Sequence, residues 1–153
     1  MTPASRANGE TRPNQPNSFL CTIQDFADFD LEFDFLVDKE LNSGVQIRSS
    51  EIPNSTEMRG HQADIGAGWW GKLYEEHGRN LLWKKSGKEH VNAGQWNVYR
   101  IEAIGSRIRT WINGHMCVDM DDPQGSREGI IALQLHSGRA TEIRFRNLVL
   151  EVK

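Results

Sequence analysis

The chain has 153 residues, a length that suits one domain with a core large enough to fold alone. Its 18 basic and 21 acidic side chains give a formal charge of −3. There is no run of about 18 apolar residues, which excludes a membrane-spanning helix. There is also no cluster of Lys and Arg of the kind that neutralises phosphates, so we expect no nucleic-acid partner.

The first 17 residues are polar, contain three prolines and lack the apolar centre of a signal peptide. We expect an irregular arm over residues 1–17 and one folded domain over residues 18–153. Cys21 and Cys117 lie far apart and show no CxxC or Cys/His spacing, so a zinc site is not expected. Free, half-buried thiols are favoured over a disulfide between the two.

From Phe19 onward, apolar and polar residues alternate with period two, and Gly and Asn interrupt the pattern at short intervals. This pattern is typical of half-buried strands and predicts an all-β sandwich. The first clear strand, residues 29–37, has one apolar face and one acidic face. The acidic face consists of Asp30, Glu32 and Asp34.

The next segments alternate less cleanly. Residues 41–44 are expected to turn the chain, and the following strand carries Val45 and Ile47 on one face and Gln46 and Arg48 on the other. Pro53 and its polar neighbours predict a loop over residues 50–59.

Residues 61–65 are predicted to form a strand with Ala63 and Ile65 inward and Gln62 and Asp64 outward. A glycine-rich bend over residues 66–71 then leads into residues 72–76.

Residues 96–120 give the clearest local pattern, because Gly105-Ser106 and Asn113-Gly114 separate alternating runs and suit two-residue hairpin turns. We predict a three-stranded meander there, followed by strands over residues 130–136 and 141–152. The apolar phase shifts within the last strand, which predicts a bulge near Asn147. No helical periodicity or phosphate-binding glycine loop is found, which excludes Rossmann, P-loop and helical-bundle functions.

Four i, i+2 pairs of polar residues project from one side of their strands, and neighbouring strands would join them into a polar floor. Polar groups for hydroxyls, with flat aromatic side chains at the edge, are what a sugar needs. The alternative is that these residues are the solvated side of a sheet. The pairs are Glu32 with Asp34, Gln46 with Arg48, Gln62 with Asp64, and Gln134 with His136, and the aromatic residues are Trp69, Trp70 and Tyr74.

Several of these residues also have an ordinary structural interpretation. Arg48 suits a surface ion pair as well as a ligand contact, and His136 suits a hydrogen-bonded sheet position more than a base. Glu75, Glu76 and His77 form either a charged loop end or part of a site. Trp96 and Trp111 are interpreted as packing residues.

Glycoside hydrolysis by a carboxylate pair is disfavoured. A retaining glycosidase needs two carboxyl groups about 5–5.5 Å apart. Adjacent residues on a strand, such as Glu75 and Glu76, face opposite ways. The run Glu32-Phe33-Asp34 is similar to the signature of sandwich-fold glucanases, but Leu36 and Val37 occupy the places of its third acid.

Eight segments match one family in order and spacing. They include Asn42-Ser43-Gly44 followed by Arg48, Trp96-Asn97 followed by Tyr99, and Asn113-Gly114. The full set is residues 18–22, 28–33, 41–49, 60–66, 94–100, 111–114, 133–136 and 143–147. From about Ser18 to Lys153 the chain therefore resembles the 3-keto-disaccharide hydrolase domain family, also described as 3-keto-glucoside 1,2-lyase and 3-keto-2-hydroxy-glucal hydratase.

The resemblance implies a concanavalin A-like lectin/glucanase jelly roll of two antiparallel sheets, with the concave face as the ligand groove. It also implies sugars oxidised at C3 as substrates. A ketone at C3 acidifies the C2 proton, so a base can remove it and the C1 oxygen can leave by elimination without a carboxylate pair. Hydration of the 2-hydroxy-glycal would complete a net hydrolysis.

Two alternatives remain open beside this enzyme. One is a non-catalytic carbohydrate-binding module that uses the same groove. The other is an interaction domain of a larger complex that contacts a protein through Trp69 and Trp70.

The resemblance also suggests roles for the candidate residues. Arg48 would hold the enolate or a hydroxyl with its fixed positive fork, and the base and acid candidates are Asp64, Glu75, Glu76 and His136. The sugar-binding candidates are Gln46, Gln62, Trp69, Trp70, Tyr74 and Gln134. No cofactor is evident, although a divalent metal ion held by Asp64, Glu76 and His136 is an alternative electrophile.

Family members usually carry a further N-terminal stretch, with a Phe-Asp-Gly motif and a Trp-containing strand, and are often exported. The polar arm stands in its place here. We therefore expect either a late start of this chain or a sheet edge that lacks a strand.

Overall fold

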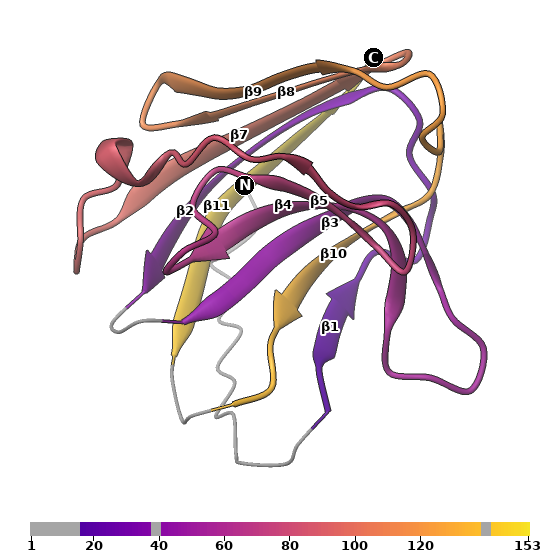
Figure 1. Ribbon diagram of the computed structural model, residues 1–153, viewed down its shortest axis with the longest axis horizontal. Coiled ribbons are helices and arrows are strands. Elements are labelled where there is room, and N and C mark those ends of the chain that lie inside the picture. Colours follow the sequence, from indigo (N-terminus) through magenta and orange to yellow (C-terminus); the bar gives the residue numbers. More distant parts are fainter. Residues whose placement is uncertain (1–15, 38–40, 139–141) are drawn as a thin grey trace.

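The computed structural model describes residues 16–37, 41–138 and 142–153. These residues form two antiparallel sheets that lie as two layers (Figure 1). The first sheet has the strand order β1-β10-β3-β4-β5-β6 and the second has the order β11-β2-β7-β8-β9. The predicted all-β sandwich is therefore confirmed.

The first sheet contains β1 (Ser18–Cys21), β3 (Asn42–Glu51), β4 (Met58–Gly66), β5 (Leu73–Glu76), β6 (Asn80–Trp83) and β10 (Ile130–Leu135). The second contains β2 (Phe29–Val37), β7 (Asn97–Ile104), β8 (Arg107–Ile112), β9 (His115–Asp121) and β11 (Ile143–Val152). A short 3-10 turn, η1 (Lys88–His90), lies between β6 and β7.

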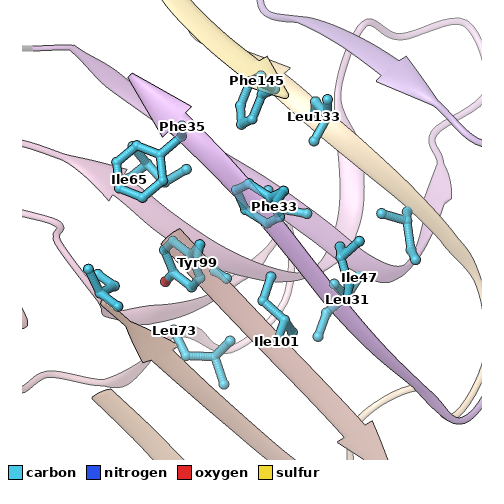
Figure 2. Close-up of a cluster of buried hydrophobic side chains, with 14 of the residues drawn as sticks. Leu31, Phe33, Phe35, Ile47, Ile65, Leu73, Tyr99, Ile101, Leu133 and Phe145 are labelled. Atoms are coloured by element: carbon cyan, nitrogen blue, oxygen red, sulfur yellow. The ribbon is translucent and has the colours of Figure 1, made fainter. Parts of the chain in front are cut away.

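The core lies between the two sheets and is built from the apolar faces of their strands. Phe33 of β2 stacks on Tyr99 of β7 with ring centroids 5.6 Å apart, and it also contacts Phe145 of β11. Figure 2 shows these rings beside Ile47 and Leu133 of the first sheet. All five side chains are buried, so the alternation read from the sequence places the core correctly.

The predicted meander is confirmed as β7, β8 and β9, which pair in sequence order. Asn113 and Gly114 have φ values of 50° and 79°, as a two-residue turn between right-twisted strands requires. The bulge predicted near Asn147 is also present. The register of β11 against β2 shifts between Arg146 and Val149, and Asn147 has a φ of 54°.

The boundaries of β3 and β4 differ from the prediction. Residues 42–44, expected to turn the chain, are the start of β3, and the loop expected over residues 50–59 is limited to residues 52–57. The small side chains serve packing between strands and do not form a turn: Ser43 Oγ donates a buried hydrogen bond of 2.6 Å to the Gln134 carbonyl of β10.

Most of the N-terminal arm expected over residues 1–17 lies outside the described residues. Asn17 is described, and it donates to Glu57 Oε1 and accepts from the Ser137 amide. Cys21 and Cys117 are free thiols, as predicted. None of the described helices is long and apolar enough to cross a membrane.

Candidate functional site

One face of the first sheet points away from the sandwich core and carries polar side chains. Gln46 of β3 pairs with Gln62 of β4, Gly44 pairs with both Asp64 and Gln134, and Tyr74 of β5 pairs with Gln62. We call this the polar face and define it by Gln46, Gln62, Asp64, Tyr74, Glu76 and Gln134. The predicted polar floor is present where β10, β3, β4 and β5 lie side by side.

Four of these residues, with Ser49, form one connected set of hydrogen bonds. Ser49 Oγ donates to Gln46 Oε1 at 2.6 Å, and Gln46 Nε2 donates to Gln62 Oε1 at 2.8 Å. Gln62 Nε2 then donates to Asp64 Oδ1 at 3.0 Å and to Gln134 Oε1 at 3.1 Å. The amide groups are therefore oriented along one direction, toward Asp64 and Gln134.

The residues of this set are buried, which was not expected of outward-facing positions. Gln46, Gln62, Asp64 and Gln134 are only 0–3% exposed. They lie on β3, β4 and β10, where each side chain finds a hydrogen-bonding partner among the other three instead of in water. A solvated sheet face is therefore the wrong interpretation for these four residues.

Asp64 has the properties of a general acid or base. Burial raises the pKa of its carboxyl group to about 7, with Glu76 adding to the rise and Gln62 and Lys72 opposing it. Its Oδ2 atom is buried without a hydrogen-bond partner among the described residues. A group that is close to half protonated at neutral pH, with one oxygen free, can take or give a proton there.

Glu76 shares the polar face with Asp64, since it pairs with Gly60 two residues before Gln62. Burial and the nearby Glu57 raise the pKa of Glu76, while His77 and His136 lower it. Glu76 therefore holds its proton more readily than a solvated glutamate.

His136 follows β10, and its Nδ1 lies 2.6 Å from the Ser137 carbonyl. Within the described part of the chain, the ligand atoms of Asp64, Glu76 and His136 do not gather within 4.8 Å of one another. Glu76 acts electrostatically on Asp64, and His136 acts on Glu76. A divalent ion held by these three residues stays a prediction.

Lys72 is a site residue that the sequence analysis missed. Its carbonyl accepts a hydrogen bond from the Asp64 amide, and its charge lowers the pKa of Asp64. The Lys72 ammonium lies 5.6 Å from the centre of the Trp69 ring, which itself packs edge-on against Tyr74. The signal was available, since Lys72, directly before β5, continues the alternation of Tyr74 and Glu76.

Arg48 does not join the polar face, contrary to the prediction that pairs it with Gln46. Its backbone has a φ of 47°, and the register of β3 against β4 shifts there. The guanidinium donates hydrogen bonds to the Ala27 carbonyl at 2.7 Å, the Gly105 carbonyl at 2.6 Å and Asp28 Oδ1 at 3.0 Å. The β-bulge breaks the alternation, so Ser49 takes the place beside Gln46 and Arg48 points toward the second sheet.

Glu75 faces away from the polar face, as the alternation with Glu76 requires. It pairs with His61, whose Nε2 lies 2.7 Å from Asp122 Oδ2 and 3.9 Å from Glu75 Oε2. Arg79 is ion-paired to both carboxylates and holds the pKa of Asp122 at about 2. The cluster could not be predicted because Asp122 is distant in sequence. The Arg79 guanidinium already supplies a positive charge beside the carboxylates of this cluster. We therefore interpret the cluster as a structural ion-pair group.

The remaining candidates lie elsewhere. Glu32 and Asp34 are on β2 of the second sheet, where Asp34 Oδ2 accepts from Arg146 and Asn147, so this pair is not part of the floor. Trp70 stacks on Phe35 at the core and lines a separate cavity of about 350 Å³. Of the two adjacent tryptophans, Trp69 is therefore the one beside the polar face.

Trp96 and Trp111 pack as predicted, although their partners are arginines. The Arg146 guanidinium lies 3.8 Å from the centre of the Trp96 ring, and that of Arg100 lies 4.5 Å from Trp111. These two tryptophans therefore hold side chains of the second sheet in place.

Solved structures that are similar to this one include a candidate glycosyl hydrolase, a carbohydrate-binding module and a galectin. A candidate glycosyl hydrolase from Parabacteroides distasonis ATCC 8503 has a TM-score of 0.67 at 24% identity, covering 90% of this chain and 84% of its own. The carbohydrate-binding module CBM66 from Bacillus subtilis has a TM-score of 0.69 at 18% identity, covering 98% and 94%. Chicken galectin 2 has a TM-score of 0.60 at 7% identity, covering 88% and 98%. At these identities the likeness establishes the fold.

No curated protein matches the chain in sequence. One family does match, and its description is "3-keto-alpha-glucoside-1,2-lyase-like domain". The match spans residues 2–151 and so begins well before Ser18, where the resemblance was expected to start. Because it takes in nearly the whole chain, this protein belongs to the 3-keto-alpha-glucoside-1,2-lyase-like domain family.

Proposed function

We propose that the domain cleaves glycosides whose sugar carries a ketone at C3, by eliminating the C1 substituent and then adding water. Membership of the family gives the domain a carbohydrate-related function. The observation that carries the finer proposal is Asp64, a buried carboxyl group with a pKa of about 7 and an Oδ2 atom that no described residue engages. Such a group is suited to move a carbon-bound proton at neutral pH.

In the first step the Asp64 carboxylate removes the proton from C2 of the sugar. The C3 ketone acidifies that proton, because the electrons of the C2–H bond pass into an enolate. Arg48 was expected to stabilise the enolate oxygen. We assign this role to Lys72, whose charge already lowers the pKa of Asp64.

In the second step the enolate re-forms the ketone and a C1–C2 double bond, and the C1–O bond breaks. The leaving oxygen takes a proton, for which Glu76 is the candidate, since its pKa is raised on the same face. Addition of water then places a hydroxyl on C1 and returns a proton to C2. The balance is one water consumed and one 3-keto sugar and one alcohol released.

Sugar recognition on this face would rest on the aromatic edge. Trp69 and Tyr74 are half-buried and pack against each other with ring centroids 5.9 Å apart. Their exposed parts offer flat apolar surface for the C–H groups of a sugar ring, while Gln134 supplies an amide from β10.

The test is to incubate the purified protein with a 3-keto-disaccharide and, separately, with its unoxidised parent, and to follow release of the second sugar. We expect cleavage of the keto form alone. A parallel arm with a chelator tests the divalent ion: loss of turnover that added metal restores would assign the electrophile to a metal ion.

Asp64→Asn is the matched variant, because it keeps the size of the side chain and removes the base. It should lose at least a hundredfold in kcat while retaining sugar affinity, with Asp25→Asn on an exposed residue as the control. A folded protein that binds the sugar and cleaves neither form would overturn the proposal and point to a carbohydrate-binding module.

A further inference from the structure

We infer that Gln62 is a positioning residue that acts through Asp64 and does not bind the sugar: its amide occupies Asp64 Oδ1, so that Oδ2 is the oxygen that exchanges the proton. The inference rests on the proposed function and reassigns a residue expected to contact substrate. It follows from the hydrogen bonds that Gln62 makes on both sides.

The amide of Gln62 has its hydrogens engaged. A glutamine side chain carries two N–H donors and one carbonyl oxygen. One hydrogen of Gln62 Nε2 goes to Asp64 Oδ1 and the other to Gln134 Oε1, while its Oε1 accepts from Gln46. No donor is left for a sugar hydroxyl.

The orientation of this amide is fixed by Asp64 Oδ1. A carboxyl oxygen that carries no proton can only accept hydrogen bonds, so Gln62 must present its nitrogen there and its oxygen to Gln46. Gln46 must then turn its own oxygen toward Ser49, whose hydroxyl donates at 2.6 Å. The set of hydrogen bonds is therefore consistent from one end to the other.

Space for this arrangement comes from Gly44. A Cβ atom at that position would lie 2.7–2.8 Å from Cγ, Cδ and Nε2 of Gln62. The Gln62 side chain thus lies directly over the glycine of β3, and this lets one amide reach Asp64 on its own strand and Gln134 on β10, which flanks β3 on the other side.

The main variant is Gln62→Met, which keeps the length of the side chain and removes both donors. Because the Gln62 hydrogen bond lowers the pKa of Asp64, its loss should raise that pKa. Asp64 acts as the base, so the acidic limb of the pH profile should move to higher pH. We expect kcat to fall about tenfold to a hundredfold with KM changed less than threefold, since a displaced base slows chemistry more than binding. Gln24→Met, on an exposed residue, is the control.

A second readout does not depend on turnover. The carboxyl carbon of Asp64 can be titrated by NMR and identified as the signal absent from Asp64→Asn. Its midpoint should rise in Gln62→Met, and rise less in Ser49→Ala, which removes the donor at the far end and serves if Gln62→Met does not fold.

The two proposals fail differently. A wild-type protein that does not cleave 3-keto-disaccharide, but whose Asp64 titration shifts in the variants, would refute the reaction and leave the positioning intact. An unchanged titration with a raised KM would show that Gln62 contacts the sugar, and the inference would be wrong.

Discussion

At the scale of single residues, the state of Asp64 follows from what surrounds its two oxygens. Oδ1 receives an amide hydrogen from Gln62, whereas Oδ2 is buried and has no partner among the described residues. A carboxylate that loses its water without gaining enough donors or a close cation is more stable with a proton. Burial is therefore the main reason for its pKa of about 7.

This pKa makes a prediction about stability. Between pH 4 and 7 folded Asp64 keeps a proton that the unfolded chain, with a pKa near 3.8, releases. The free energy of unfolding should therefore fall as pH rises through this window, by about 1.4 kcal/mol per pH unit at most, and level off above pH 7. Asp64→Asn should lose this dependence. The free energy of unfolding of the variant should therefore rise relative to that of the wild type from pH 5 to pH 8.

Urea unfolding of the two proteins at pH 5, 6, 7 and 8 measures the difference. Other ionisable groups contribute to both proteins and cancel in the comparison. A difference that stays constant with pH would show that Asp64 is ionised in the folded protein throughout.

Residue-level reasoning from the sequence succeeded where alternation is regular. Gln46, Gln62, Asp64 and Gln134 share one face, as period two predicts. It failed at Arg48, because a β-bulge changes which face the following residues take and polar residues give no sign of it. Burial of these glutamines depends on partners from separate strands, so it was not visible in the sequence.

At the scale of elements, β3 shows how a small residue inside a strand serves its neighbours. Gly44 leaves the space into which the Gln62 side chain extends. We predict that Gly44→Ala destabilises the fold by about 1–3 kcal/mol, because the added methyl displaces Gln62 from its partners. Chemical denaturation measures this cost.

A double-mutant cycle separates this contact from a general effect on β3. Shortening the side chain in Gln62→Ala removes the atoms that the new methyl group meets, so Gly44→Ala should cost much less in that background. If the free-energy costs of the two substitutions simply add, the methyl group acts through a contact other than the one with Gln62.

The same strand explains the error in its predicted start. Asn42-Ser43-Gly44 has the composition of a turn, and local propensity alone favours one. In the structure Ser43 is buried and donates to β10, so pairing with a strand 91 residues away in sequence overrides the local signal. The Asn113-Gly114 turn was predicted correctly because both partners of that hairpin are adjacent in the chain.

At the scale of the whole molecule, Arg48 joins the two sheets. It belongs to β3 of the first sheet, and its guanidinium bonds to Ala27 and Asp28 before β2 and to Gly105 after β7. Its side chain is 1% exposed. Arg48→Met should lower the free energy of unfolding by about 3 kcal/mol, since two carbonyl groups and Asp28 lose a buried charged donor.

The comparison is Arg107→Met, whose guanidinium pairs with Asp119 on the surface and should matter much less. Any folded Arg48→Met protein should keep the kcat of the wild type at temperatures well below its melting point. A large loss of kcat without loss of stability would show that Arg48 takes part in the reaction.

Which strands become neighbours was the least predictable property of the fold. The acidic pair Glu32 and Asp34 has the same pattern as the pairs of the polar face, yet β2 pairs with β11 and β7 in the second sheet. Strand order depends on contacts across the full chain, and period two is the same in both sheets. The His61 cluster was missed for this reason, since His61, Glu75 and Asp122 come together only when their segments become neighbours.

The bulge at Asn147 has a consequence for how copies of the protein meet. Among the described strands, β11 forms an outer edge of the second sheet; it is ten residues long, and its Val149 and Val152 are each 63% exposed. A long, regular edge of this kind is a template on which a second chain can add a strand. The bulge interrupts the regular spacing of the edge N–H and C=O groups in mid-strand, which leaves only short straight stretches on either side and protects the protein against aggregation through this strand.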